Sequence, residues 1–256
     1  MPKHELAVDK ARETWDALWR SRKRLYVYRN VLNAAQSFLG DLSGRTALEV
    51  GCGRGATLLE LARHGAHVVG LDYSEEALTF CRELHSRTRV AGNVAFLNGD
   101  AARLPFGEGA FDFVYSVGLI EHFRDPMQIL AEQQRVLRPG GFLLVQVPQK
   151  YSLYTVVKKV MMHLGKWPYG GWETQFSDKE ISKLVRNSGL QPEQVYGYGS
   201  FLLAAIRHTF APNLDFGVMW RNGSELKTLR AVKSKTALEI CVVAMKKAVP
   251  AERDSR

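Results

Sequence analysis

The stretch LEVGCGRGATLLELA, at residues 48–62, constrains the fold more than any other part of this chain. Three glycines, Gly51, Gly53 and Gly55, alternate directly after an apolar run and directly before a helical pattern. A strand that passes through a glycine-rich turn into a helix lets the backbone approach a bound molecule closely. The stretch therefore predicts an α/β fold with a ligand held on this turn.

Apolar runs typical of strands recur along the chain, and helical patterns separate them. The runs are TALEV, HVVGLD, VAFLNGD, FDFVYSV and FLLVQVP, in that order. One helical pattern covers about residues 5–39, and another covers residues 126–137 and is expected to end at the RPGG of residues 138–141. Strands that alternate with helices predict a parallel sheet that is covered on both faces.

The composition is that of one globular domain with a substantial core. The chain has 256 residues, of which 46% are hydrophobic and 24% are charged. No apolar stretch reaches the length of a membrane span, and the first residues lack the apolar region of a signal peptide, so a cytoplasmic protein is expected. Cys52, Cys81 and Cys241 are widely spaced, which predicts free thiols and neither a disulfide framework nor a zinc site.

The formal net charge of +9 raises the question of a nucleic-acid partner. The basic residues are dispersed, however, and the densest run, RSRKR at residues 20–24, fits a solvated helix face. No RNA-binding aromatic motif and no zinc-finger spacing accompanies that run. The sequence therefore argues against nucleic acid as the main partner.

The glycine pattern alone does not identify the ligand, because Gly51-x-Gly53-x-x-Ala56 also fits a dinucleotide loop with Asp72 about 20 residues further on. Glu49 gives a stronger indication than the glycine spacing. A carboxylate roughly 6 Å from the bound group contributes about 3 kcal/mol per unit charge at an effective dielectric of about 20. That charge opposes a pyrophosphate and favours a cation. S-adenosylmethionine (SAM) carries a sulfonium and an ammonium group and no phosphate, so the sequence favours SAM.

Five segments in order, ALEVGCGRGA, VVGLDYS, NGDAARLPF, FDFVYSVGLIEHF and RVLRPGG, resemble the motif series of class I SAM-dependent methyltransferases. The likeness is strongest to the small-molecule branch that includes quinone-biosynthesis enzymes. It runs over about residues 46–147 and continues more loosely to Met245. It implies a Rossmann-like, seven-stranded, mostly parallel sheet with helices on both faces, an antiparallel last strand and an N-terminal helical cap. It also implies a single methyltransferase domain over residues 1–256, composed of the cap (1–45), the SAM-binding core (46–148), a lid or acceptor insertion (149–176) and the C-terminal half of the sheet (177–250).

The resemblance also implies a SAM site on the loops after the first four strands. Gly51 and Gly53 would let the backbone approach the methionine end, and Asp72 would accept hydrogen bonds from the ribose hydroxyls. The alternative for Asp72 is an ordinary acid at a helix entry. The candidate cofactor-binding residues are Glu49, Gly51, Cys52, Gly53, Asp72, Tyr73, Asp100, Ala101, Leu104 and Val117.

Adenine is expected to lie against residues that follow the second and third strands. By the resemblance, Asp100 would accept from the adenine amino group and the Ala101 N–H would face a ring nitrogen. Tyr73 and Leu104 are candidates to sandwich the ring. The alternative for Tyr73 is an aromatic side chain that packs on the core at the end of a strand.

A dehydrogenase was the competing enzyme class, because Tyr154 and Lys158 match the Tyr-x-x-x-Lys pair of short-chain dehydrogenases. The glycine motif of that family does not accompany the pair, since Thr57 stands where its last glycine would be. A pair without its structural context carries little weight.

His122, just past the fourth strand, is the candidate catalytic base, because open α/β sheets bind their ligands at the carboxyl ends of the strands. The alternative is a histidine that only bonds a neighbouring loop, and Glu121 beside it could be a solvated acid at a helix start. Gly118 stands where some similar quinone O-methyltransferases carry a further acid thought to hold a metal. No metal is therefore expected.

The acceptor is expected to meet the insertion at residues 149–176, where Val156, Val160 and Leu164 share one stripe of a helical pattern. That stripe could pack on the protein's own core as a lid, line a site for an apolar acceptor, or make a weak peripheral contact with a membrane. The predicted function is methyl transfer from SAM to a small-molecule or lipidic acceptor by in-line displacement. A non-catalytic SAM-binding scaffold and an RNA methyltransferase that uses the basic surface are the alternatives. The sequence identifies neither the acceptor nor the oligomeric state.

Overall fold

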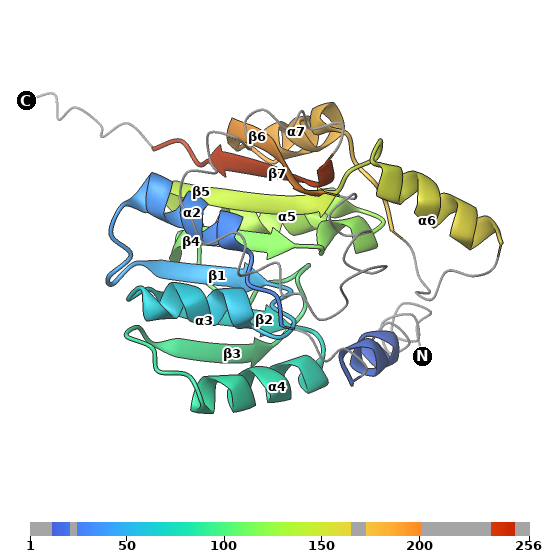
Figure 1. Ribbon diagram of the computed structural model, residues 1–256. Coiled ribbons are helices and arrows are strands. Elements are labelled where there is room, and N and C mark those ends of the chain that lie inside the picture. Colours follow the sequence, from blue (N-terminus) through green and yellow to red (C-terminus); the bar gives the residue numbers. More distant parts are fainter. Residues whose placement is uncertain (1–11, 21–24, 165–172, 201–236, 249–256) are drawn as a thin grey trace, which may run out of the picture.

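The computed structural model describes residues 12–20, 25–164, 173–200 and 237–248. Its centre is a seven-stranded sheet with the order β3-β2-β1-β4-β5-β7-β6 (Figure 1). The first five strands are parallel, whereas β7 pairs antiparallel with both β5 and β6. The predicted fold class, including the antiparallel last strand, is confirmed. The strands are β1 Thr46–Val50, β2 His67–Asp72, β3 Val94–Asn98, β4 Phe111–Val117, β5 Leu137–Pro148, β6 Gln191–Ser200 and β7 Ala237–Met245.

Helices cover both faces of the sheet. Side chains of α2 and α3 pack with Phe113 and Tyr115 on one face, and side chains of α5 and α7 pack with Val114 on the other. Neighbouring residues of β4 point to opposite faces, so a strand covered on both sides has to be apolar throughout. The helices are α2 Arg29–Leu39, α3 Ala56–Arg63, α4 Glu75–Ser86, α5 Pro126–Val136, α6 Leu153–His163 and α7 Asp178–Asn187, with a short 3-10 helix, η1, at Ile120–His122.

Polar residues set the starts of two of these helices. The Ser74 hydroxyl accepts a hydrogen bond from the Ala77 N–H at 3.2 Å, and so caps α4. Ser177 and Glu180 form a reciprocal capping box at the start of α7. The α4 cap follows β2 directly, so it also fixes the loop that leaves the carboxyl end of that strand.

The long helix expected over residues 5–39 is wrong in its continuity. Residues 12–20 are helical and α2 begins only at Arg29, with the non-helical residues 25–28 before it. The Tyr28 N–H donates to the Thr57 hydroxyl of α3 at 3.0 Å. This tertiary hydrogen bond takes the place of a helical one, and the chain changes direction there. Residues 1–11 and 21–24 lie outside the described part.

The predicted end of the helix before β5 also needs a correction. The helix ends at Val136, and the RPGG of residues 138–141 already belongs to β5. The Gly140 N–H donates to the Lys246 carbonyl at 2.8 Å, and the Lys246 N–H donates to the Gly141 carbonyl at 3.0 Å. Pairing with the chain that follows β7 therefore makes strand out of residues whose local pattern is that of a turn.

The insertion after β5 contains the expected helix, α6. On this helix and just after it, Val156, Val160 and Leu164 are 53%, 54% and 56% exposed, so the described members of the predicted stripe do not pack on the core. In Figure 1, α6 projects from the body of the protein beyond β5 and β7. The side chains of Leu153, Tyr154, Val157 and Lys158, and all of residues 165–172, lie outside the described part.

Candidate functional site

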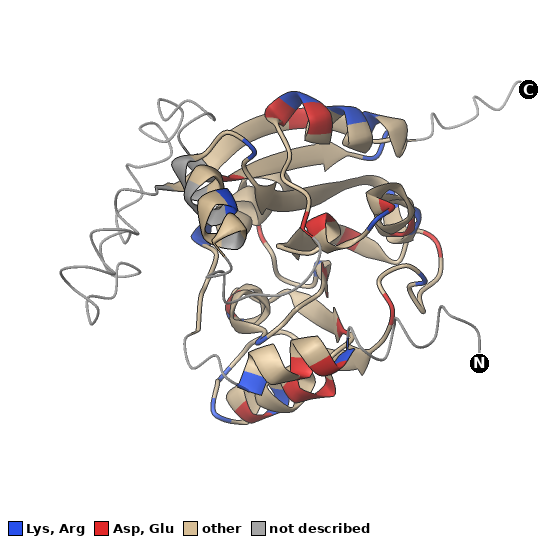
Figure 2. Ribbon diagram, turned by 90° about the vertical axis from the view of Figure 1, so that its right-hand side faces the viewer, with Lys and Arg blue, Asp and Glu red and all other residues tan. Residues whose placement is uncertain are grey.

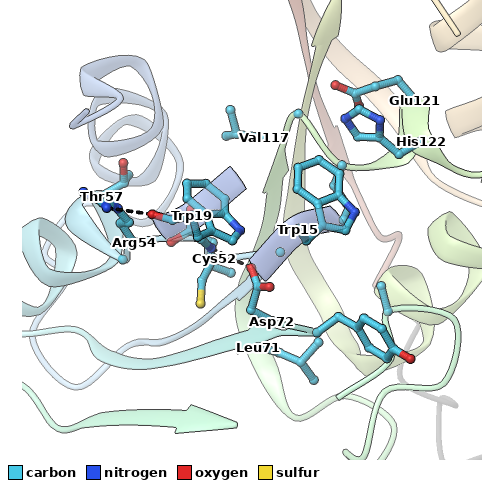
Figure 3. Close-up of a pocket in the computed structure, with 18 of the residues that line it drawn as sticks. Trp15, Trp19, Cys52, Arg54, Thr57, Leu71, Asp72, Val117, Glu121 and His122 are labelled. Atoms are coloured by element: carbon cyan, nitrogen blue, oxygen red, sulfur yellow. Dashed lines mark hydrogen bonds between the residues drawn. The ribbon is translucent and has the colours of Figure 1, made fainter. Parts of the chain in front are cut away.

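A cavity of about 660 Å³ opens at the carboxyl edge of the sheet (Figure 3), within the usual size range of small-molecule sites. All of the candidate site residues line it except Leu104. Leu104 is 3% exposed within the core, and its N–H donates to Glu132 Oε2 at 2.7 Å. That hydrogen bond orients the loop so that Ala102, and not Leu104, reaches the cavity wall.

The glycine loop approaches its neighbours so closely that side chains have no space there. Gly51 and Gly53 have φ values of +74° and +50°, a region that favours glycine. A Cβ atom at Gly53 would lie 2.6 Å from Trp19 Cη2, and one at Gly51 would lie 2.8 Å from Leu119 Cδ1. The loop is fixed to β2, since the N–H groups of Gly51 and Cys52 donate to the Leu71 carbonyl at 2.8 and 3.0 Å. The backbone itself therefore forms the floor of the cavity.

Asp72 sits at the end of β2 and links two loops of the site. Its Oδ2 accepts from the Gly53 N–H at 2.7 Å and its Oδ1 accepts from the Ser74 N–H at 2.9 Å. Burial raises the pKa of Asp72, and the negative charge of Asp16 adds to the effect. Each carboxylate oxygen keeps a further lone pair for an incoming donor such as a sugar hydroxyl.

Glu49 is a buried carboxyl group in the wall of the cavity. The Tyr115 hydroxyl donates to its Oε2 at 2.9 Å. Burial raises the pKa of Glu49 to about 8, against the opposing effect of the Tyr115 hydrogen bond. A cation beside a buried acid of this kind favours its ionised form, so Glu49 fits the sulfonium and ammonium groups of SAM.

His122 lies on η1, directly after β4, and borders the cavity. Its ring meets the ring of Trp15 edge to face, with 4.9 Å between the centroids and 80° between the planes. Figure 3 shows both rings on the same side of the cavity. Glu121 is buried, so the interpretation of this residue as a solvated acid is wrong. The Glu121 carbonyl accepts from the Thr174 N–H at 2.8 Å, which joins the loop after β4 to the chain before α7.

The N-terminal helical segment, residues 12–20, forms part of the cavity wall. The sequence did not predict this contribution. Trp15 and Trp19 line the cavity, and the Arg54 Nη2 donates to the Trp19 carbonyl at 2.9 Å. The same segment also contacts the loop after β2, since the guanidinium of Arg12 lies 4.4 Å from the centre of the Tyr73 ring. Trp15 and Trp19 are four residues apart, and this spacing on a helix places both indoles on one face. The spacing was a visible signal of a shared contact, but it did not indicate which surface the face would meet.

Several other lining residues were not predicted from the sequence. They include Tyr28, Glu173 and Glu239. Glu239 stands in the strand sequence ALEICVVAM, where one acid interrupts an apolar run. An acid within a strand that is covered on both faces is unusual, and this was the sequence signal that could have identified Glu239 as a site residue.

Comparisons with known proteins agree with this geometry. The sequence pattern of the family described as "Methyltransferase domain" matches residues 48–145. The ubiquinone biosynthesis O-methyltransferase of Acinetobacter baumannii (strain ACICU) is 26% identical over 193 residues, which cover 73% of this chain and 81% of the relative. These matches support a class I SAM-dependent methyltransferase.

Solved structures show the same methyltransferase fold. The magnesium protoporphyrin IX methyltransferase of Synechocystis PCC 6803, solved with bound S-adenosylhomocysteine, aligns with a TM-score of 0.64 at 18% identity and covers 96% of this chain and 100% of its own. A SAM-dependent methyltransferase of Methanosarcina mazei aligns with a TM-score of 0.62 at 20% identity and covers 88% and 100%. The protein is an enzyme that uses SAM, which supplies an activated methyl group when it is bound.

Three further features of the described residues concern membranes, metals and thiols. Within the described ranges, no helix is long and apolar enough to cross a membrane. Among those same residues, no three His, Cys, Asp or Glu side chains are grouped so as to hold a metal ion. Cys52, Cys81 and Cys241 are buried free thiols.

Proposed function

We propose that this methyltransferase acts on a small-molecule or lipidic acceptor, which it binds beside the cofactor in the 660 Å³ cavity. The observation that carries the proposal is the division of the cavity along the sheet. Candidate cofactor residues follow β3, β2, β1 and β4, and a second set of lining residues, Pro148 and Glu239, continues over β5 and β7. The volume of the cavity suits a molecule of limited size. The relative named for ubiquinone biosynthesis supports an acceptor of this class.

We propose that the cofactor lies with its methionine end on the glycine loop and its adenosine toward β3. Glu49 then faces the positively charged end, Asp72 accepts from the ribose hydroxyls, and Asp100 with Ala101 borders the adenine. Cys52, Tyr73 and Val117 complete this half of the cavity wall. The chemistry of these residues supports the arrangement. The carboxylates can interact with cations and accept from hydroxyls, and the glycines leave space for the ligand to approach the backbone closely.

We propose His122 as the base that takes a proton from the acceptor atom. It borders the cavity at the end of β4, and the edge-to-face contact with Trp15 holds its ring in place. A positioned base close to the reacting atom contributes roughly 100-fold or more to a rate. The other main task of the chain is to hold the acceptor in line with the methyl group and to exclude water.

The single sheet that runs from β1 to β7 supports one methyltransferase domain, in which residues 149–176 form an insertion at the acceptor side. We propose that α6 in this insertion makes a weak, reversible contact with an anionic membrane, from which a lipidic acceptor would be taken. The exposed side chains of Val156, Val160 and Leu164, with the exposed Lys159 nearby, support this contact.

RNA is disfavoured as the acceptor. The cavity is lined by the carboxyl groups of Glu49, Asp72, Asp100, Glu121, Glu173 and Glu239, which repel a polyanion. On α4 the acids Glu75, Glu76 and Glu83 outnumber the basic residue Arg82, and α7 carries charges of both signs (Figure 2), so neither helix presents a purely basic face.

The experiment that tests this proposal is methyl transfer from SAM with a labelled methyl group into fractionated metabolite, lipid and RNA extracts. The expected result is label in a small-molecule or lipid fraction, with a loss of about 100-fold in the His122→Ala variant. Label in the RNA fraction alone, with steep salt dependence, would contradict the proposal.

A further inference from the structure

A chain of polar side chains, buried at Asn30, Gln146 and Cys241 and half-buried at Glu239, leads from α2 through β5 to β7 and ends at the cavity. The Asn30 Nδ2 donates to Gln146 Oε1 at 2.7 Å, and the Cys241 thiol donates to the same oxygen at 3.2 Å. The Gln146 Nε2 donates in turn to Glu239 Oε2. Because two donors hold the Gln146 oxygen, its amide NH₂ has to face Glu239. The network therefore orients Glu239 and assigns it the role of an acceptor.

Glu239 occupies the cavity wall at the start of β7. In the strand register it lies opposite Pro148 of β5 on one side and Tyr198 of β6 on the other. Its neighbours along β7, Ile240 and Cys241, are fully buried. Removing a carboxylate from water in such a strand is costly unless a partner compensates for it. Burial raises its pKa to about 7, so a cation arriving beside it would favour the ionised form.

The position of Glu239 in the sheet separates it from the proposed cofactor residues. β7 is the second strand beyond β4, and neighbouring strands are about 4.8 Å apart, so Glu239 stands roughly 10 Å from the line of β4. Val117 and His122 mark the end of β4, where the methyl group would be transferred. Glu239 is therefore placed to hold a part of the acceptor remote from the atom that is methylated.

The charges of this half of the cavity favour a cation. Glu121, Glu173 and Glu239 line it, and the guanidinium of Arg54, the cationic lining side chain on the glycine loop, donates to the Trp19 carbonyl and lies 4.0 Å from the Phe80 ring centre. The ring of Tyr28 lines the cavity too, with its centroid 6.4 Å from that of Tyr198. Aromatic rings beside a carboxylate are a typical setting for an organic ammonium group.

We propose that Glu239 is a specificity-determining residue that anchors a protonated amino group of the acceptor at the β7 end of the cavity. Gln146 is its positioning residue, because its amide holds the carboxylate toward the cavity. This inference rests on the proposed function, since it assigns the β5 and β7 half of the cavity to the acceptor. It narrows the acceptor class to molecules that carry a basic amine at a distance from the methylated atom.

The test uses three probes of one shape and different charge: phenethylamine, 2-phenylethanol and 3-phenylpropanoate. Each is titrated calorimetrically into the full chain, with and without S-adenosylhomocysteine. The amine is expected to bind most tightly and the carboxylate most weakly. Glu239→Gln, which keeps the shape of the side chain, should weaken amine binding about tenfold or more and change alcohol binding by less than about twofold. Glu193→Gln, the same change on the exposed part of β6, is the matched control and should change neither.

The pH dependence of amine binding separates an ionic anchor from a structural role. Affinity for phenethylamine should rise from pH 6 to pH 8 as Glu239 ionises, and this rise should be absent in Glu239→Gln. The neighbouring groups on β7 and β6 do not titrate in that range, because burial raises the pKa values of Cys241 and Tyr198, and Gln146 on β5 has no ionisable group. Gln146→Met should reduce the amine preference while the binding of S-adenosylhomocysteine is kept.

Two outcomes would overturn the inference. One is equal binding of the amine by the wild type and by Glu239→Gln, and the other is tighter binding of the carboxylate than of the amine. Binding of S-adenosylhomocysteine to the wild type reports separately on the proposed cofactor site, because Glu239 lies outside that half of the cavity. The same titration of Glu239→Gln shows that this variant is folded.

Discussion

Replacing Glu49 by Gln should remove the pH dependence of SAM binding. Burial raises the pKa of Glu49 to about 8, so the carboxyl group of the free protein is mostly protonated at neutral pH. The ammonium and sulfonium groups of SAM are stabilised by the ionised form. Binding at pH 7 therefore has to release the proton of Glu49. The free energy needed to ionise Glu49 lowers the affinity for SAM.

The size of the effect follows from the pKa. One pH unit below the pKa, ionising the group costs about 1.4 kcal/mol, which corresponds to a factor of about ten in affinity. SAM should thus bind about tenfold more tightly at pH 7.5 than at pH 6.5, with release of close to one proton. Glu49→Gln keeps a polar partner for the Tyr115 hydroxyl but has no proton to release. Its SAM affinity should be weaker, by about tenfold or more at pH 7.5, and independent of pH.

The same variant should be more stable than the wild type when no ligand is present. A carboxyl group whose folded pKa lies above its unfolded pKa contributes stability below pH 4, and loses that contribution as the pH rises toward 8. Glu49→Gln removes this loss, so its free energy of unfolding at pH 7 should rise by up to about 3 kcal/mol. A substitution that raises the free energy of unfolding but weakens SAM binding identifies a residue whose role is to bind the ligand.

Calorimetry of SAM in two buffers of different ionisation enthalpy measures the released proton, and urea unfolding measures the stability. A wild-type protein that releases no proton between pH 6.5 and pH 7.5 would refute the assignment of Glu49 to the cationic end of SAM. A pH dependence that persists unchanged in Glu49→Gln would refute it as well.

Three further changes test other parts of the account. His122→Ala should lower turnover about 100-fold or more and leave SAM affinity nearly intact, as steady-state kinetics and calorimetry would measure; unchanged turnover would give this residue a structural role only. Val160→Asp should reduce binding to phosphatidylglycerol vesicles in a flotation assay without affecting SAM binding, since it places a charge in the exposed apolar stripe of α6; equal vesicle binding would argue against membrane contact. Ser177→Ala should cost about 1 kcal/mol of stability, because it removes the cap of α7 and its exchange of hydrogen bonds with Glu180; an unchanged urea midpoint would contradict this.

The sheet and the glycine loop could be predicted because their signals are local. The backbone of Gly51 and Gly53 needs positive φ, and the adjoining residues supply the strand and the helix. Asp72 and Glu49 take their places from the ends of the strands that carry them. Leu104 was misplaced because the N–H hydrogen bond to Glu132 turns its loop, and that partner is 28 residues further along the chain.

Other parts of the cavity wall depend on contacts between distant segments, which the sequence pattern does not contain. Trp19 meets Gly53 only because residues 12–20 fold back over the glycine loop. The break in the long N-terminal helix results from the hydrogen bond between Tyr28 and Thr57. Glu239 reaches the cavity because β7 runs antiparallel, which brings its first residues to the edge where the parallel strands end.

Calorimetric titration of SAM into the wild type and into Asp72→Ala tests the proposed cofactor site most directly. The wild type should bind SAM in the micromolar range, and NADH should not bind. Asp72→Ala should bind SAM about 100-fold more weakly, because two hydrogen bonds to a charged group are lost, whereas Glu83→Ala on the exposed face of α4 should bind it as the wild type does. Equal SAM affinity in the wild type and Asp72→Ala, or tighter binding of NADH than of SAM, would contradict the account.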